Sequence, residues 1–202
     1  MKIRTLPFTQ SSHKWPLALL LLASAILSVP VHAETVLLMR AICGGSLLTA
    51  GEGVRDGFED YVELSSIHHD LSAPLRSAPG GTPAPGILSI DPIRIVKSTS
   101  ASSIGMISVI AQSQFCSEIL LENRQFGGVA QSVPVWRLEL QETYIVARKE
   151  WHTAEAVPPL GIPQESFELF PTRVGWTHFS VDAQGSVTPV EFTWDFSTNS
   201  VP

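Results

Sequence analysis

The sequence predicts an all-β domain, an antiparallel β-barrel or two-sheet sandwich with one short helix, and two observations carry this prediction. First, short segments rich in β-branched residues alternate with clusters of Gly, Pro, Ser and Thr along most of the chain after residue 33. Second, residues 165–199 form two alternating arms around a turn at Asp182–Gly185. The apolar positions recur at every second residue within each stretch, which gives each arm one apolar face: Phe167 and Leu169, then Val174 and Trp176, and in the second arm Val190, Phe192, Trp194 and Phe196.

The two tryptophans of these arms, Trp176 and Trp194, are predicted to belong to the core because they share the alternation. Pro171 interrupts the first arm, and because proline cannot donate to a ladder we expect an edge or a bend there. Trp151 borders a proline-rich loop, so it is the better candidate for a contact with a partner.

The N-terminus has the layout of a secretory signal peptide. Three basic residues precede the apolar run Leu17–Val29, and Val31 and Ala33 place small residues before a cleavage site between Ala33 and Glu34. The alternative is an uncleaved membrane anchor, but the run of 13 residues is shorter than the about 18 that a spanning helix needs. We therefore expect export by a Sec-type leader (residues 1–33), a mature domain of residues 34–202 in the periplasm or outside the cell, and no membrane insertion after cleavage.

Charge excludes some classes of partner. The leader contains three basic and no acidic residues, so the mature chain has 10 basic and 19 acidic residues, a net charge of −9. Nucleic acids and anionic lipid surfaces bind Lys/Arg-rich patches, so neither is an expected partner.

The strands before the C-terminal arms are predicted in order. Thr35–Arg40 is uniformly apolar, which indicates burial on both faces. Phe58–Ser66 is the second strand and Ile87–Val96 the third, with Pro92 marking an edge or a bulge. Ser117–Asn123 follows. The longest segment, Pro134–Lys149, is expected to place four large side chains on one face: Trp136, Leu138, Leu140 and Tyr144.

Residues 104–111 are ambiguous from periodicity alone. Met106, Ile107, Ile110 and Ala111 make a helical stripe, whereas Ile107, Val109 and Ala111 alternate as in a strand. Several serines between residues 98 and 103 are candidates for a helix N-cap.

Three motifs carry a resemblance to a known family. They are Glu165-Ser166-Phe167, then Trp176-Thr177 followed by an Asp-x-x-Gly turn, and the terminal Trp194-Asp195-x-x-Thr198-Asn199. Their order and spacing resemble the C-terminal half of haemolysin-coregulated protein, Hcp, the tube protein of type VI secretion. The resemblance implies a helix over residues 104–111 that plugs one mouth of a barrel.

The resemblance also implies a function without catalysis or a cofactor. Hcp protomers form hexameric rings that stack into a tube carrying effectors, so the expected partners are other copies of the chain and effector or secretion-apparatus proteins. In Hcp-like proteins, a long loop after the second strand contacts the neighbouring ring. Here the resemblance implies that this contact is made by Pro74, Leu75, Arg76, Pro79, Pro83 and Pro85.

One feature departs from the family. Type VI tubes are assembled in the cytoplasm from subunits without a leader, which leaves two hypotheses: a ring or tube component, or an exported stand-alone Hcp-like binding module. A secreted hydrolase on a β-scaffold is a third class, and no set of convergent polar residues in the sequence supports it.

The two cysteines of the mature chain, Cys43 and Cys116, are either a disulfide or two buried free thiols. An even count in an exported protein favours the bridge, which stabilises by about 2–4 kcal/mol where the geometry fits.

Other candidate sites have simpler interpretations. His68 and His69 would point to opposite faces of a strand, so with Asp70 they make a poor metal site. Glu59, Asp60 and Glu63 are interpreted as solvated charges and not as a glycosidase pair. The glycines between residues 51 and 57 have the wrong spacing for a nucleotide loop. No catalytic, cofactor-binding or metal-binding residue is therefore predicted.

Overall fold

The computed structural model describes residues 34–53, 55–75, 86–127, 132–151, 163–182 and 186–202. Its elements follow in the order β1 (Glu34–Cys43), β2 (Ser46–Leu47), β3 (Val62–His68), β4 (Leu71–Ser72), β5 (Ser89–Ile90), β6 (Ile93–Ser98), α2 (Ala101–Ala111), β7 (Phe115–Phe126), β8 (Ser132–Trp151), β9 (Gln164–Val181) and β10 (Val187–Asp195).

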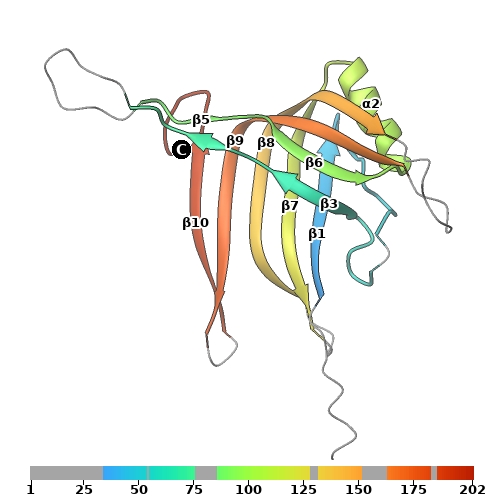
Figure 1. Cartoon of the computed structure of the whole chain (residues 1–202), viewed down its shortest axis with the longest axis horizontal. Coiled ribbons are helices and arrows are strands. Elements are labelled where there is room, and N and C mark those ends of the chain that lie inside the picture. Colours follow the sequence, from blue (N-terminus) through green and yellow to red (C-terminus); the bar gives the residue numbers. More distant parts are fainter. Residues whose placement is uncertain (1–33, 54, 76–85, 128–131, 152–162, 183–185) are drawn as a thin grey trace, which may run out of the picture. The chain divides into compact units, whose positions relative to one another are not determined.

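Six strands close an antiparallel barrel. The hydrogen-bonded order is β9-β6-β3-β1-β7-β8, and β8 pairs back with β9 to complete the ring. The lower parts of β1, β7, β8 and β9 run on past the barrel, and β10 adds to β9, so the wall continues as an open sheet (Figure 1). We call this part the extension. The predicted all-β barrel with one helix is confirmed.

β9 belongs to both parts. Its residues 164–169 pair with β6, its residues 173–181 pair with β10, and both halves pair with β8. Pro171 falls between the last pair with β6, at Leu169, and the first pair with β10, at Arg173. On the side of β9 that faces β6 and β10, no ladder hydrogen bond requires an N–H from Pro171. The proline therefore lies at a local edge, as expected.

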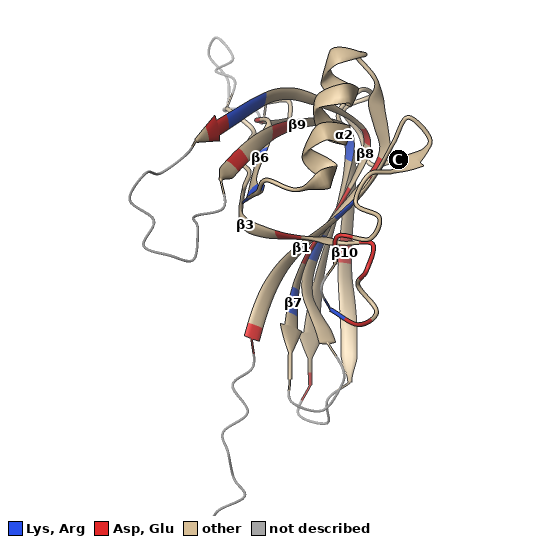
Figure 2. Ribbon diagram, turned by 90° about the vertical axis from the view of Figure 1, so that its right-hand side faces the viewer, with Lys and Arg blue, Asp and Glu red and all other residues tan. Residues whose placement is uncertain are grey.

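The core fills the barrel and is covered at one end by α2. Met106 and Val109 of the helix are buried in the same cluster as Met39, Ile95 and Phe167. The helix begins after Ser100, whose backbone N–H donates to Ser103 Oγ at 2.9 Å. Figure 2 shows the helix against the ring of strands. The helical reading of residues 104–111 is thus confirmed.

In β7, β8 and β9, the set of alternate residues that faces the core switches along one line across the three strands. On β8, Leu138 and Leu140 face the core before Glu142 (φ 47°), whereas Thr143 and Ile145 face it afterwards. The prediction that Tyr144 shares a face with Leu138 was therefore wrong, because the positive φ at Glu142 turns Tyr144 to the outside. Side chains still alternate between the two faces on each side of Glu142, but even-numbered residues face the core before it and odd-numbered residues face the core after it.

Two strand boundaries also differ from the prediction. Residues 58–61 form a turn, and β3 begins only at Val62. Phe58 instead packs its ring against Tyr61 and Phe126, with centroids 5.4 and 5.6 Å apart. The predicted third strand is split into β5 and β6 at Asp91–Pro92, as the proline indicated.

The outer face of the extension carries a second small cluster, held by charge. Glu122, which is almost fully buried, accepts from Arg137 Nε at 2.8 Å and from Arg124 Nη1 at 3.1 Å. Arg124 lies over the Phe58 ring at 4.9 Å, and Arg55 over the Phe126 ring at 4.7 Å. These contacts pin the segment before β3 to the sheet.

Candidate functional site

A buried ionic network fastens α2 to the barrel. Lys97 Nζ lies 3.0 Å from Glu165 Oε1, and both side chains are fully buried. Lys97 also donates to Ser100 Oγ at 2.6 Å and to Ser103 Oγ at 3.0 Å, and Arg148 Nε donates to Glu165 Oε2 at 2.9 Å. The paired charges and their hydrogen bonds satisfy one another, which is the condition for burying them.

The electrostatics of Glu165 follow from this arrangement. Burial alone would raise the pKa of its carboxyl, but hydrogen bonds from Ser103, Lys97 and Arg148 outweigh burial and hold that pKa below its usual range. Lys97, Ser103 and Glu165 are buried, so the network positions the start of the helix against the barrel.

Glu52 completes the attachment from the segment after β2. Its carboxylate accepts from the Ser102 backbone N–H and, at 2.9 Å, from Ser100 Oγ. A carboxylate at this end of a helix satisfies a free N–H group and complements the helix dipole.

The core-side face of the extension is apolar and partly uncovered. Trp176 stacks on Phe192 with ring centroids 5.6 Å apart, and Trp194 follows at 6.1 Å from Phe192. We define the extension patch as Trp136, Trp176, Val190 and Phe192, of which Val190 and Phe192 are exposed. Trp176 and Trp194 are partly buried, and Trp176 packs against the core as predicted.

A small pocket borders the extension patch. It has a volume of about 280 Å³ and lies where His69 approaches Trp136, Trp176 and His178. Its walls are mostly apolar, so it suits an apolar side chain better than a polar metabolite.

The opposite face of the same sheet carries a second aromatic surface. Phe115 pairs in register with Tyr144, and Tyr144 with Phe170, across β7, β8 and β9. These three residues, which we define as the outer patch, are 47%, 45% and 46% exposed. Large exposed aromatics in adjacent register mark protein contact surfaces, whereas scattered ones do not.

The predicted contact loop is carried by a narrow arm. β4 and β5 pair with each other outside the barrel sheet and lead into the loop. Pro74 and Leu75 are exposed, and Leu75 is 71% exposed. A Cβ on Gly86 would lie 2.1 Å from the Pro74 carbonyl oxygen, so only glycine fits at that point. Arg76, Pro79, Pro83 and Pro85 lie outside the described residues.

Cys43 and Cys116 face each other at the barrel end beside α2. They are cross-strand neighbours on β1 and β7, both are buried, and their Sγ atoms form a disulfide, 1.98 Å apart.

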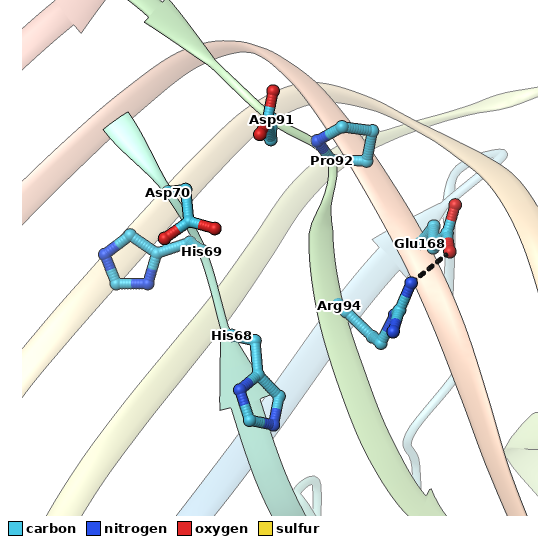
Figure 3. Close-up of a pocket in the computed structure, with 7 residues that line it drawn as sticks. All are labelled: His68, His69, Asp70, Asp91, Pro92, Arg94 and Glu168. Carbon is cyan, nitrogen blue, oxygen red and sulfur yellow. Dashed lines mark hydrogen bonds and ion pairs between the residues drawn. The ribbon is translucent and has the colours of Figure 1, made fainter. Parts of the chain in front are cut away.

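His68, His69 and Asp70 line an open pocket of about 410 Å³ together with Asp91, Pro92, Arg94 and Glu168 (Figure 3). The two imidazole rings lie on either side of the chain at the end of β3, and Arg94 is paired with Glu168 at 2.9 Å. Within the described ranges, no group of three or more His, Cys, Asp or Glu side chains could hold a metal ion. Glu63 of the acidic set is an outer-face charge that pairs with Arg55 at 2.8 Å.

The terminal motif forms a turn. Asp195 accepts hydrogen bonds from the Ser197 and Thr198 backbone N–H groups, and its other oxygen accepts from Arg173 at 2.9 Å. Hydrogen bonds from Ser197 and Arg173 hold the pKa of Asp195 well below its usual range. Asn199 follows with φ 52°, a conformation that asparagine tolerates. The motif residues thus end β10 in a hydrogen-bonded turn.

Acidic and basic positions are interspersed along the described strands in Figure 2. Of the helices that the described ranges contain, none has the length and apolar character to cross a membrane.

Comparison with known proteins identifies the family. The family model described as "Type VI secretion system effector, Hcp" matches residues 35–178. The chain belongs to the Hcp family. Among curated proteins, none matches this sequence.

Solved structures share the fold at low identity. One described as a type six secretion system protein is 15% identical with a TM-score of 0.70, covering 83% of this chain and 99% of its own. Hcp1 from Salmonella typhimurium is 14% identical with a TM-score of 0.61, over 83% and 99% of the two chains. The secreted protein Hcp3 from Pseudomonas aeruginosa is 15% identical with a TM-score of 0.56, over 79% and 99%. The Hcp-like fold expected from the C-terminal motifs is confirmed.

The surface patches and the buried ion pair of this chain are only partly predictable from its sequence. The apolar alternation of β9 and β10 indicated the extension patch, but it was assigned wholly to the core. The outer patch was missed because Tyr144 was placed on the wrong face. The Lys97–Glu165 pair was missed as well, since a lysine and a glutamate on separate strands give no local sign of burial.

Proposed function

We propose that the mature chain, residues 34–202, is an exported Hcp-family subunit that assembles head to tail into closed rings. The observation that carries this is the pair of uncovered aromatic surfaces, the extension patch and the outer patch, on opposite faces of the β7–β8–β9 sheet. Two different patches on one protomer favour a heterologous contact, which closes into a ring when the rotation allows.

The contact joins the extension patch of one copy to the outer patch of the next. Stacked rings such as Trp176 and Phe192 supply a rigid, mostly apolar surface, which is the composition of a stable interface core. The family's hexamer sets the expected ring size, and the arm that carries Pro74 and Leu75 is available for contact with a stacked ring.

Export by the leader is part of the same proposal. β1 includes Glu34, the first residue after the expected cleavage site, so a chain cleaved there would keep all of the described strands. Arg55 pairs with Glu34 at 3.0 Å and with Glu63 at 2.8 Å, which fixes this end of the mature domain to the sheet. Intact-mass measurement of the exported protein should give a chain that begins at Glu34.

A mixing experiment tests the ring. Phe192→Glu in the extension patch and Tyr144→Glu in the outer patch should each give monomers by size-exclusion chromatography with light scattering, whereas the unchanged mature protein gives a closed oligomer. A one-to-one mixture of the two variants should form dimers and nothing larger, because each dimer can use one intact extension patch and one intact outer patch. Ile104→Lys, on the exposed face of α2, is the matched control and should still assemble.

The second candidate is an exported stand-alone Hcp-like binding module. The small pocket beside His69 and Trp136 favours it, because it could receive an apolar side chain of another protein. An unchanged mature protein that stays monomeric at all concentrations would support this module and overturn the ring.

A further inference from the structure

We propose that the Cys43–Cys116 bond is a maturation switch for the outer patch: it orders the strand end that carries Phe115 once the chain reaches an oxidising compartment. The inference deepens the proposed function, on whose export step it rests. It starts from an irregularity in the strand pairing next to the two cysteines.

The β1–β7 ladder is regular from Glu34 opposite Phe126 to Ile42 opposite Glu118, and then it shifts. Cys43 lies opposite Cys116, so Ser117 is an extra residue on β7. A bulge of this kind interrupts the ladder and leaves the extra residue unpaired. Ser117 Oγ donates to the Ile42 carbonyl at 3.3 Å.

Beyond the bulge, the contact between β1 and β7 is weak without the bond. Among the described residues the backbone contact there is Gly44 N–H to the Phe115 carbonyl, at a long 3.4 Å. Gly44 and Gly45 both have positive φ, 56° and 79°, so the chain turns away at once. The disulfide is therefore the principal link between these two strand ends.

Phe115 is the member of the outer patch that depends on this link. It is adjacent to Cys116, begins β7, and follows Ser113, which has φ 51°. On one side it pairs with Tyr144 of β8 at a ring distance of 6.2 Å. With the bond formed, its strand end is held from β8 and covalently from β1. With the bond broken, the β1 side is held by the long Gly44–Phe115 hydrogen bond and the Ser117 contact, without the covalent link.

The burial of the pair makes the bond durable after it forms. Cys43 and Cys116 are 2% and 0% exposed and belong to the same core cluster as the helix residues Met106 and Val109. Formation transfers two electrons and two protons from the thiols to a disulfide donor, which leaves as two thiols while the new S–S bond forms. Such donors act in oxidising compartments outside the cytoplasm and not in the reducing cytoplasm. The subunit would thus acquire an ordered outer patch only after export.

Hydrogen exchange on the mature protein tests the switch. The oxidised protein is compared with the same protein in dithiothreitol and with Cys43→Ala/Cys116→Ala, which keeps the site apolar. In both altered forms, exchange at residues 42–48 and 113–117 should rise about tenfold or more, as for a locally opening strand end. β6, at residues 93–98, serves as the internal reference and should be unchanged. Equal exchange at residues 113–117 in the oxidised and reduced proteins would overturn the proposal.

Assembly gives the second measurement. The concentration needed for oligomers should rise about tenfold or more on reduction, by the same loss of order. An unaltered assembly concentration would overturn the switch even if exchange rises. A protein that is monomeric in both redox states, yet exchanges faster when reduced, would overturn the ring and support the ordering role of the bond, so the two failures are distinguishable.

Discussion

Lys97 Nζ and Glu165 Oε1 meet 3.0 Å apart inside the barrel, where neither side chain reaches solvent. The pair joins β6 to β9, which are neighbours in the barrel, and its serine partners tie it to the start of α2. Closure of the barrel and docking of the helix therefore depend on one set of charges.

Loss of either charge should destabilise the fold strongly. Lys97→Met or Glu165→Gln alone leaves a buried charged partner poorly compensated, which costs about 3–5 kcal/mol of unfolding free energy. The double variant Lys97→Met/Glu165→Gln should cost clearly less than the sum of the two, because the unpaired buried lysine charge is gone. Urea unfolding of the four proteins measures this, and strict additivity would contradict a direct coupling.

Stability should fall in acid, with Glu165 as a contributor. The folded-state pKa of Glu165 lies below its usual range, so the unfolded chain takes up the proton first and unfolding becomes easier as pH falls. The contribution is complete above the unfolded-state pKa of about 4.3 and is lost as pH drops through the lower folded-state pKa. Unfolding free energies measured from pH 7 down to pH 3 should decline less steeply for Glu165→Gln than for the unchanged protein. Glu191→Gln, on the exposed part of β10, is the control and should leave the slope as it is.

Removal of the Glu52 carboxylate should loosen the start of α2. Glu52→Ala removes the acceptor for the Ser102 N–H and should cost about 1 kcal/mol, the usual cost of a lost helix cap. Amide exchange at residues 101–104 should accelerate, while exchange in β1 stays slow. Glu59→Ala, in the turn before β3, is a matched acidic control.

Asp195→Asn should unfasten the terminal turn without unfolding the barrel. The amide keeps the shape of the carboxylate but loses its charge, so the contacts with Arg173 and the Ser197 N–H weaken. Exchange at residues 195–200 should rise, whereas the thermal midpoint of the barrel changes little. A large drop in that midpoint would contradict a purely terminal role for Asp195.

Much of the fold could be predicted from the sequence, for physical reasons that can be named. Two-residue alternation identified β9 and β10, Pro171 and Pro92 marked where ladders stop, and the terminal motifs indicated the family. The helix could not be decided by periodicity, since its apolar positions fit both periods, and only the resemblance separated the two.

The remaining features depend on contacts that no local pattern encodes. The positive φ at Glu142 changes the phase of a strand, so Tyr144 leaves the face on which simple alternation places it. Phe58 packs against the rings of Tyr61 and Phe126 instead of forming part of β3. The burial of Lys97 requires a carboxylate from a strand far along the chain, and the patches are defined by register between strands.

The seam between β6 and β9 also sets the order in which the molecule can be made. Ile93 has Leu169 as its ladder partner, so the ring of strands stays open until the segment at residues 164–169 has emerged from the ribosome or a translocation pore. A chain whose barrel closes this late leaves the apolar side chains of its central strands exposed during most of its synthesis. That delay suits a route on which the chain must be threaded before it folds.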